Sequence, residues 1–340
     1  MSKSPKTQPY QVLAHTDNVL IVQTNAGMPL ATPADSTFDK TADNTTGEEP
    51  NQSNSFGQFN LGLHVNDDPT QVLHNRAVLL QLLNEYLIAH ESKSEPEHTH
   101  EYQHENGKVA AVEAIYWLNQ IHSNQVIRID ATDQETSHKL SLTSPSADAL
   151  VTVAPHQALA VMTADCVPIV VYDSNSQQVA AIHAGWQGLA NGVIFETYHE
   201  LNKIEGTVTS DKPLQAWIGA CISQSCYEVS NDVVNKLLLG CENAGMNRQA
   251  IEQHIVAKHE NSNKAWLDLP KLAQLQLNQL GIEVVAPQAE SSALDALSET
   301  KGSLALACSY GDNSYYSYRR KTHLAEKNTG RMALLIVKLN

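Results

Sequence analysis

The sequence of 340 residues is poor in cysteine and in basic residues, and it contains no long apolar run. Its five cysteines are odd in number and lack a disulfide-like spacing, so we expect a reducing, cytoplasmic setting. Lys and Arg number 22 against 37 Asp and Glu, and the resulting charge of −15 argues against nucleic acid or an anionic membrane as partners. No apolar stretch approaches the roughly 20 residues of a membrane span, and residues 1–10 lack the apolar stretch of a secretory signal.

Two stretches of biased composition, residues 24–55 and 91–108, contain few aliphatic residues. Neither can bury enough apolar surface to offset the entropy of ordering, so we expect both to be mobile surface insertions. Three histidines of the second stretch could hold a metal, although a solvated acidic loop with adventitious metal affinity is the favoured interpretation. These histidines are His98, His100 and His104. The expected organisation is an N-terminal strand region with its insertion over residues 1–55, followed by one catalytic domain over residues 56–340.

The rest of the sequence alternates between strand and helix patterns. A helix should begin near Asp67-Asp68-Pro69, with an Asp as cap and Pro in the first turn, and its apolar face should run through Val72, Ala77, Leu80, Leu83 and Leu87. A second helix should begin at Asp268 and end at Gly281. Strands are predicted for residues 158–172, 178–183 and 332–339, and a further helix for residues 189–202. This interleaving predicts a single domain of mixed α and β structure.

Two apolar runs flank the polar turn at residues 174–178 and predict a β-hairpin. If Tyr172 lies opposite Val179, then Cys166 falls opposite Gly185. Cys166 and His183 then become diagonal neighbours on one face of the sheet, within reach of a shared metal ion or a hydrogen bond. The glycine leaves open space beside the sulfur. A slip of one residue in this register would move one of the two side chains to the other face.

Either residue alone is more often structural, because a cysteine in an apolar run is usually a small buried hydrophobe. The convergence of Cys166 and His183 with a glycine-rich exit from the hairpin favours a functional site. His122 is placed at another strand end, after the apolar run at residues 114–118. The pattern alone links it only weakly to the other two.

Three segments that carry these residues resemble the core motifs of the YfiH family, whose members are described as polyphenol oxidase or laccase, purine nucleoside phosphorylase and peptidoglycan editing factor. The three segments are residues 119–122, 163–168 and 182–188. Further matches follow in the same order from about residue 55 to the C-terminus, at 60–69, 75–76, 218–222, 226–229, 268–269, 316–320 and 329–331. Two positions depart from the family pattern. Gln187 replaces the usual Arg, which calls into question any anion contact there, and Ser123 replaces the usual Gly.

The resemblance implies an α+β fold of mixed β-sheets covered by helices, in the layer order α/β/β/α. It also implies a zinc ion bound by His122, Cys166 and His183. Three nitrogen and sulfur ligands with a free fourth position are typical of a catalytic zinc site. Such an ion lowers the pKa of bound water to about 7 and polarises a substrate atom.

The activity implied by the resemblance is phosphorolysis of purine nucleosides (adenosine, inosine, guanosine and S-methyl-5'-thioadenosine) together with deamination of adenosine. The expected partners are therefore a small nucleoside and phosphate. The candidate substrate-binding residues are Asn60, Arg76 and Arg319, of which the two arginines would contact phosphate or else make structural ion pairs. Asp165 would shuttle a proton in deamination, because the usual zinc-deaminase motif is absent, or would hold its loop as a hydrogen-bond acceptor.

Other functions would use the same residues. Cys166 activated by His183 would make a thiol hydrolase, which fits the editing of a peptidoglycan precursor. Copper-dependent phenol oxidation ranks below zinc chemistry, because a laccase needs several coppers and the core offers one ligand set. A non-enzymatic metal-binding or scaffold protein would need no open coordination position. Cys221 and Cys226, separated by four residues, are interpreted as core or loop thiols in preference to a second metal site or a redox pair.

Overall fold

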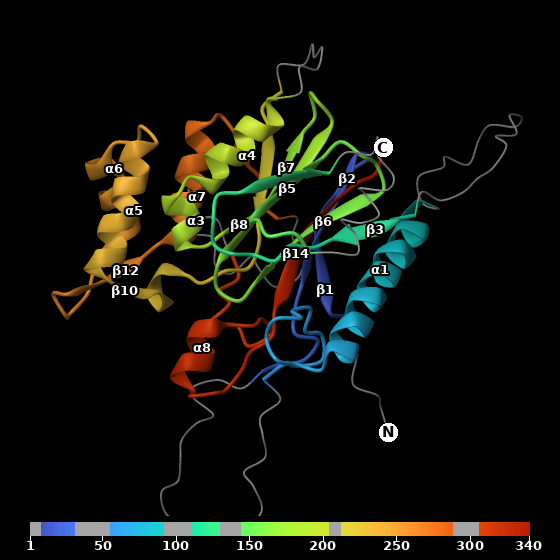
Figure 1. Cartoon of the computed structure of the whole chain (residues 1–340), viewed down its shortest axis with the longest axis horizontal. Coiled ribbons are helices and arrows are strands. Elements are labelled where there is room, and N and C mark those ends of the chain that lie inside the picture. Colours follow the sequence, from blue (N-terminus) through green and yellow to red (C-terminus); the bar gives the residue numbers. More distant parts are fainter. Residues whose placement is uncertain (1–7, 31–54, 92–110, 130–143, 204–211, 288–305) are drawn as a thin grey trace, which may run out of the picture.

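The computed structural model describes residues 8–30, 55–91, 111–129, 144–203, 212–287 and 306–340 (Figure 1). Of the first compositionally biased stretch, residues 24–30 are described, and there the backbone amides of Ala26 and Leu30 donate hydrogen bonds to the carbonyl oxygens of Ser314 and Asn313. Almost all of the second stretch, including its three histidines, lies outside the described residues. The division at residue 55 stays a prediction.

Two large β-sheets form the centre of the molecule (Figure 1). The first has the strand order β1-β2-β14-β6-β3, and the second has the order β13-β9-β7-β8-β5-β4. A smaller sheet has the order β10-β12-β11. The strands are β1 (Tyr10–His15), β2 (Val19–Thr24), β3 (Ala114–Tyr116), β4 (Val126–Ile129), β5 (Ala149–Thr152), β6 (Gln157–Thr163), β7 (Val167–Asp173), β8 (Gln178–Ala184), β9 (Gln215–Ile218), β10 (Glu228–Ser230), β11 (Val256–Lys258), β12 (Lys264–Leu267), β13 (Glu283–Val284) and β14 (Met332–Lys338).

Helices cover the outer faces of both large sheets (Figure 1). They are α1 (Pro69–Glu91), α3 (Trp186–Ala190), α4 (Val193–Leu201), the 3-10 turn η2 (Gln224–Cys226), α5 (Asn231–Asn243), α6 (Arg248–Ile255), α7 (Leu269–Gln279) and α8 (Tyr318–His323). Helix α1 packs on the five-stranded sheet, whereas α3, α4 and α7 lie over the six-stranded sheet. Helices α5 and α6 pack outside α3 and α7 and against the small sheet. None of the helices in the described part of the chain combines the length and apolarity that a membrane crossing requires.

Strand β7 shows why the central apolar runs are continuous instead of alternating. Ile169 and Val171 face the helices, while Val170 and Tyr172 face the other large sheet. A strand that is covered on both faces carries apolar residues at every position. The layer order is therefore helix, sheet, sheet, helix, which confirms the predicted α+β fold class.

Helix α1 begins at Pro69, directly after Asp68, as its sequence predicts. Its buried face includes Val72, Leu79, Leu83 and Leu87. The assignment of Ala77 to this face is wrong, because that residue is exposed. The buried position on that turn belongs instead to Asn75, whose side chain donates a hydrogen bond to the Asn60 carbonyl oxygen.

The apolar run predicted as strand over residues 158–172 is two strands in different sheets. Strand β6 belongs to the five-stranded sheet and β7 to the six-stranded sheet. The chain crosses between them at residues 164–166, where Asp165 has a φ of 100°. Strand propensity alone does not reveal this crossing, which places Cys166 at the start of β7 and beside β8.

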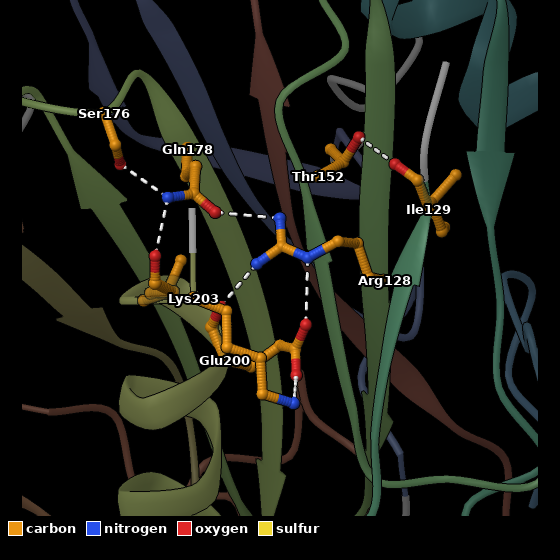
Figure 2. Close-up of polar contacts among 8 residues, drawn as sticks. Arg128, Ile129, Thr152, Ser176, Gln178, Glu200 and Lys203 are labelled. Atoms are coloured by element: carbon orange, nitrogen blue, oxygen red, sulfur yellow. Dashed lines mark hydrogen bonds and ion pairs between the residues drawn. The ribbon is translucent and has the colours of Figure 1, made fainter. Parts of the chain in front are cut away.

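A polar cluster ties β4 to α4 at the beginning of β8 (Figure 2). Nε of Arg128 lies 2.9 Å from Oε1 of Glu200, and Nη1 donates to Oε1 of Gln178 at 2.8 Å. The Gln178 amide in turn donates to the carbonyl oxygen of Leu201. Lys203 adds a second cation to Glu200. The predicted helix over residues 189–202 is two helices, α3 and α4, and this cluster fastens the second one to the sheet.

Candidate metal centre

The hairpin of β7 and β8 has the register that its sequence predicts. Tyr172 pairs with Val179, and Pro168 pairs with His183. Cys166 immediately precedes β7, so its sulfur lies next to the end of β8 that carries His183. His122 comes from a third segment, the loop between β3 and β4, where it has a φ of 58°. Three stretches far apart in the sequence thus supply one cluster of side chains.

The ligand atoms of His122, Cys166 and His183 all lie within 4.8 Å of one another. Nε2 of His122 is 3.9 Å from the Cys166 sulfur, and the two imidazole rings have centroids 4.9 Å apart at an angle of 79°. Two imidazoles and a thiolate are ligands that suit zinc, and three protein ligands leave a fourth position open. The donor set therefore fits a metal ion that also contacts substrate.

Asp148, which the sequence reasoning missed, positions two of the three ligands. One carboxylate oxygen, Oδ1, is 2.8 Å from Nδ1 of His183 and accepts a hydrogen bond from the backbone N–H of His122 at 3.0 Å. With Nδ1 engaged, Nε2 of His183 is the nitrogen available to a metal. The hydroxyl of Ser123 donates to the other oxygen at 2.7 Å. The departure from glycine at residue 123 therefore adds a hydrogen bond to the carboxylate.

The charges of this cluster are coupled. Burial alone would raise the pKa of Cys166, but the charge of His183 and hydrogen bonds from both histidines lower that pKa to about 6. Burial alone would lower the pKa of His183, but the Cys166 thiolate and the Asp148 carboxylate raise it to about 9. In the metal-free protein near neutral pH the pair is therefore thiolate and imidazolium. A metal ion would displace the imidazolium proton.

Gly185 leaves the space that the metal centre needs. A Cβ atom at this position would lie 2.9 Å from the Cys166 sulfur and 3.2 Å from Cδ2 of His122. Real Cβ atoms essentially never approach another heavy atom to 2.9 Å. Any larger residue would therefore displace the sulfur, the imidazole or both. The predicted open space beside the sulfur is confirmed.

The three ligands line a cavity of about 430 Å³. Its wall combines aromatic rings from Trp186, Tyr227 and Tyr318 with the guanidinium groups of Arg319 and Arg331. A cavity of this volume, apolar in part and with a few convergent polar groups, is typical of a small-molecule site. The arginines can bind anionic oxygens, and the rings can stack on a planar ligand.

Asp165 and Arg319 both reach this cavity and also contact each other. The Asp165 carboxylate accepts hydrogen bonds from the Ser309 hydroxyl at 2.7 Å and from the Arg319 backbone N–H at 2.7 Å. The guanidinium of Arg319 lies 5.2 Å from the ring centroid of Tyr227. Asp165 thus holds together the segments around it in addition to facing the cavity.

Asn60 and Arg76, the other two predicted substrate-binding residues, are not part of the cavity wall. The Asn60 side chain is buried and bonds to Asp67 and to the backbone amide of Arg331. Nε of Arg76 donates to the Leu61 carbonyl oxygen at 3.0 Å, and its guanidinium lies 4.2 Å from the Trp117 ring centroid. These contacts organise the loop beside the cavity, so the structure does not bring the two residues to the metal centre.

Three polar residues of the wall were missing from the sequence reasoning: His64, Gln120 and Arg331. Burial, together with the positive charges of Arg331 and Arg76, lowers the pKa of His64 to about 4, so its ring is neutral and can accept a hydrogen bond. Gln120 pairs with the backbone of Met162 on β6. All three lie in segments that resemble family motifs or flank them, and that position was the only signal available. Gln187 also lines the cavity.

Comparison with known proteins gives the same family throughout. The family model described as multi-copper polyphenol oxidoreductase laccase matches residues 88–338. A Haemophilus influenzae protein named purine nucleoside phosphorylase is 28% identical over 281 residues, which cover 82% of this chain and 86% of that protein. The Escherichia coli purine nucleoside phosphorylase YfiH is 28% identical over 284 residues, with 83% and 86% covered.

Solved structures support the fold. A Neisseria meningitidis protein of the DUF152 family has a TM-score of 0.64 and 24% identity, with 98% of this chain and 100% of that chain covered. YlmD from Geobacillus stearothermophilus has a TM-score of 0.60 and 22% identity, with 95% and 92% covered. These likenesses show that the layered architecture is shared.

Proposed function

Because the chain belongs to the YfiH family, whose family model is described as multi-copper polyphenol oxidoreductase laccase, we propose that it is a zinc-dependent purine nucleoside phosphorylase that also deaminates adenosine. The family resemblance seen in the sequence is confirmed, and relatives named purine nucleoside phosphorylase support the reaction. The observation that carries the proposal is the opening of the His122, Cys166 and His183 cluster into a cavity that also holds two guanidinium groups. The substrates are adenosine, inosine, guanosine and S-methyl-5'-thioadenosine, with phosphate as the second reactant.

The cavity offers a place for each part of these reactants. Trp186, Tyr227 and Tyr318 supply aromatic faces for the purine. Arg319 and Arg331 supply guanidinium groups for phosphate oxygens, in place of the arginine that is absent at residue 187. Arg76 is a further candidate for phosphate, but its guanidinium contacts Trp117 and the Leu61 carbonyl oxygen and does not line the cavity.

Zinc bound by the three ligands would supply an activated water and a Lewis acid at the open position. Asp148 keeps His183 oriented for that role through the Nδ1 contact. Asp165 is the carboxylate that we assign to proton transfer during deamination. The Ser309 hydroxyl and the Arg319 amide both donate to it and hold it at the edge of the cavity. The free cysteines fit the cytoplasmic setting that we propose.

A thiol hydrolase acting on a peptidoglycan precursor is the second candidate, and one observation favours it. The lowered pKa of Cys166 and the raised pKa of His183 describe an activated thiolate beside an imidazolium. Copper-dependent phenol oxidation is less well supported, since the described residues contain one group of three side chains that could hold a metal. A non-enzymatic metal-binding role does not account for a cavity at the open coordination position.

The test uses untagged protein, analysed for zinc and copper and then incubated with adenosine in the presence or absence of phosphate. We expect zinc near one equivalent, adenine and ribose 1-phosphate only when phosphate is present, and inosine without it. Full activity in metal-free protein, abolished by alkylation of Cys166, would contradict the zinc proposal and support the thiol hydrolase. Copper at several equivalents with phenol oxidation would support the laccase.

A further inference from the structure

A second group of thiols lies behind the cavity wall, outside the metal centre. Residues 221 and 308 form an isolated parallel β-bridge, in which the Ser309 amide donates to the Cys221 carbonyl oxygen at 2.9 Å. The turn that follows Cys221 brings Cys226 to the same place. Both Cys226 and Cys308 are half-buried, whereas Cys221 is fully buried. Two partly accessible thiols thus meet where two distant segments pair.

The sulfur of Cys308 lies in a nest of hydrogen-bond donors. The Ser223 hydroxyl donates to it at 3.0 Å, and the backbone amides of Ser223 and Gly311 each donate at 3.4 Å. Burial alone would raise the pKa of Cys308, but these donors and the Tyr310 amide outweigh it and lower the pKa. Donors arranged in this way stabilise a thiolate, which is the reactive form of cysteine.

The pKa of Cys226 is shifted in the opposite direction from that of Cys308. Its sulfur lies 3.7 Å from the Ser225 hydroxyl, and it interacts with the Ser223 hydroxyl and with the Cys308 sulfur. Burial raises the pKa of Cys226, and the neighbouring Cys308 raises it further. Cys308 is therefore the more acidic thiol of the pair, and Cys226 is the less acidic one. This asymmetry is typical of an attacking and a resolving cysteine.

We propose that Cys308 and Cys226 form a peroxide-sensitive dithiol that closes to a disulfide behind the wall of the cavity. The Cys308 thiolate attacks one peroxide oxygen, the O–O bond breaks, and the departing hydroxide takes up a proton to become water. Cys308 is then a sulfenic acid. Cys226 loses its proton and attacks the Cys308 sulfur, and the sulfenic oxygen leaves as a second water. Peroxide is reduced, the two thiols are oxidised to a disulfide, and a thiol reductant reverses the change.

The position of this pair connects it to the metal centre. Tyr227, the residue after Cys226, lines the cavity, and Ser309, the residue after Cys308, donates to Asp165. A disulfide would therefore join by a covalent bond the two segments that carry Tyr227 and Ser309. The inference does not depend on the proposed reaction, because it concerns the thiols themselves.

The test treats the intact protein with a few equivalents of hydrogen peroxide at neutral pH, blocks the remaining thiols and maps the cysteine peptides by mass spectrometry. We expect a linked Cys226–Cys308 peptide, lighter by two hydrogen atoms, that dithiothreitol restores. In Cys226→Ser the Cys308 sulfenic acid should accumulate and react with dimedone. In Cys308→Ser, Cys226 should stay unmodified. Linked peptides that involve other cysteines, or oxidation of Cys241 as fast as Cys308, would overturn the proposal.

Two serine variants test whether Cys308 reacts because hydrogen-bond donors stabilise its thiolate or only because it is accessible to solvent. Ser223→Ala removes a donor to Cys308 and should slow alkylation of that thiol by about tenfold, because a hydrogen bond to a charged group is lost. Ser176→Ala is the control, since its hydroxyl contacts Asp173 and Gln178 at the turn between β7 and β8, and it should leave the Cys308 rate unchanged. Equal rates in both variants and in the wild type would show that the donors do not activate Cys308.

Discussion

Each end of strand β8 carries a polar cluster, and the two clusters differ in what their polar atoms face. At Gln178 the cluster is closed: Arg128 donates to Glu200 and Gln178, and Lys203 adds to Glu200 (Figure 2). At His183 the cluster is open. Asp148 contacts Nδ1 of the imidazole, while Nε2 of His183 and the ligand atoms of His122 and Cys166 face a cavity. The same strand therefore ends in a structural ion pair on one side and in a candidate metal site on the other.

The difference lies in what the polar atoms face. Around Arg128 each charged group contacts an oppositely charged neighbour in the chain: Arg128 and Lys203 both contact the Glu200 carboxylate. Around His183 the metal-ligand atoms of His122, Cys166 and His183 face a cavity. Backbone strain does not separate the two ends, because positive φ values occur at both: 58° at His122 and 100° at Asp165, and 55° at Gln177 beside the closed cluster.

The largest expected effect comes from removing a ligand at the open end. Cys166→Ala should lower zinc content from about one ion per chain to below about 0.1, because two imidazoles alone hold zinc weakly. Phosphorolysis should fall by about 10³-fold or more. Elemental analysis and chromatography of adenosine reactions measure both. Cys241→Ala, a substitution in buried helix α5, is the control and should keep its zinc. Stoichiometric zinc in the Cys166 variant would refute the ligand assignment.

A smaller effect is expected when the ligands stay but lose their support. Asp148→Asn cannot accept all four hydrogen bonds that the carboxylate accepts now, so zinc affinity should fall by about 10- to 100-fold. Competition with a chelator measures this change. Asp173→Asn alters a buried carboxylate at the turn end of the same hairpin and should leave zinc affinity as in the wild type. A similar loss in both variants would mean that Asp148 acts through general stability.

The closed end should respond in stability and not in metal binding. Arg128→Met removes the donor to Oε1 of Gln178, to Oε1 of Glu200 and to the Glu200 carbonyl oxygen, while Lys203 still contacts Oε2 of Glu200. It should reduce the free energy of unfolding by about 2 kcal/mol. Denaturant titration measures it, with zinc content as the second readout. Arg248→Met breaks an exposed pair with Glu242 and should cost less than about 0.5 kcal/mol. Loss of zinc in the Arg128 variant would contradict the division between the two ends.

A structural feature could be predicted from the sequence when the residues that form it lie close together in the chain. The hairpin register follows from the pattern on two neighbouring strands, and it placed Cys166 beside His183 correctly. The ends of the helix that follows Asp268 are also set by neighbouring residues. The Asp268 side chain caps its N-terminus, and Gly281 lies just beyond its C-terminus with a φ of 73°. His122 joined the site only through the family motif, because its loop meets β8 through contacts that no periodicity encodes.

Residues that act across layers could not be predicted. Asp148 looks like any carboxylate before an apolar strand, and its importance arises only when His183 and the loop at His122 meet it. Asn60 and Arg76, which remain predicted substrate contacts, make loop contacts in the structure and do not line the cavity. Long-range packing decides which polar side chain reaches a cavity, and local pattern does not report it.

The smallest predicted effect is the number of protons released when zinc binds. Groups at the His183 end of β8 should release protons, and those at the Gln178 end should not. At about pH 7.5, between the Cys166 pKa of about 6 and the His183 pKa of about 9, the pair of Cys166 and His183 holds one proton, on His183. This pair should therefore contribute about one proton to the release that accompanies zinc binding, rising toward two below about pH 6 and falling toward zero above about pH 9, in addition to the proton lost by zinc-bound water. Calorimetry in buffers of different ionisation enthalpy measures the number. The closed end adds no proton in this range, because burial of Glu200 is outweighed by Lys203 and Arg128, which lower its pKa below the ordinary carboxyl value. A proton count that stayed constant across the range would show that Cys166 and His183 do not titrate as a coupled pair.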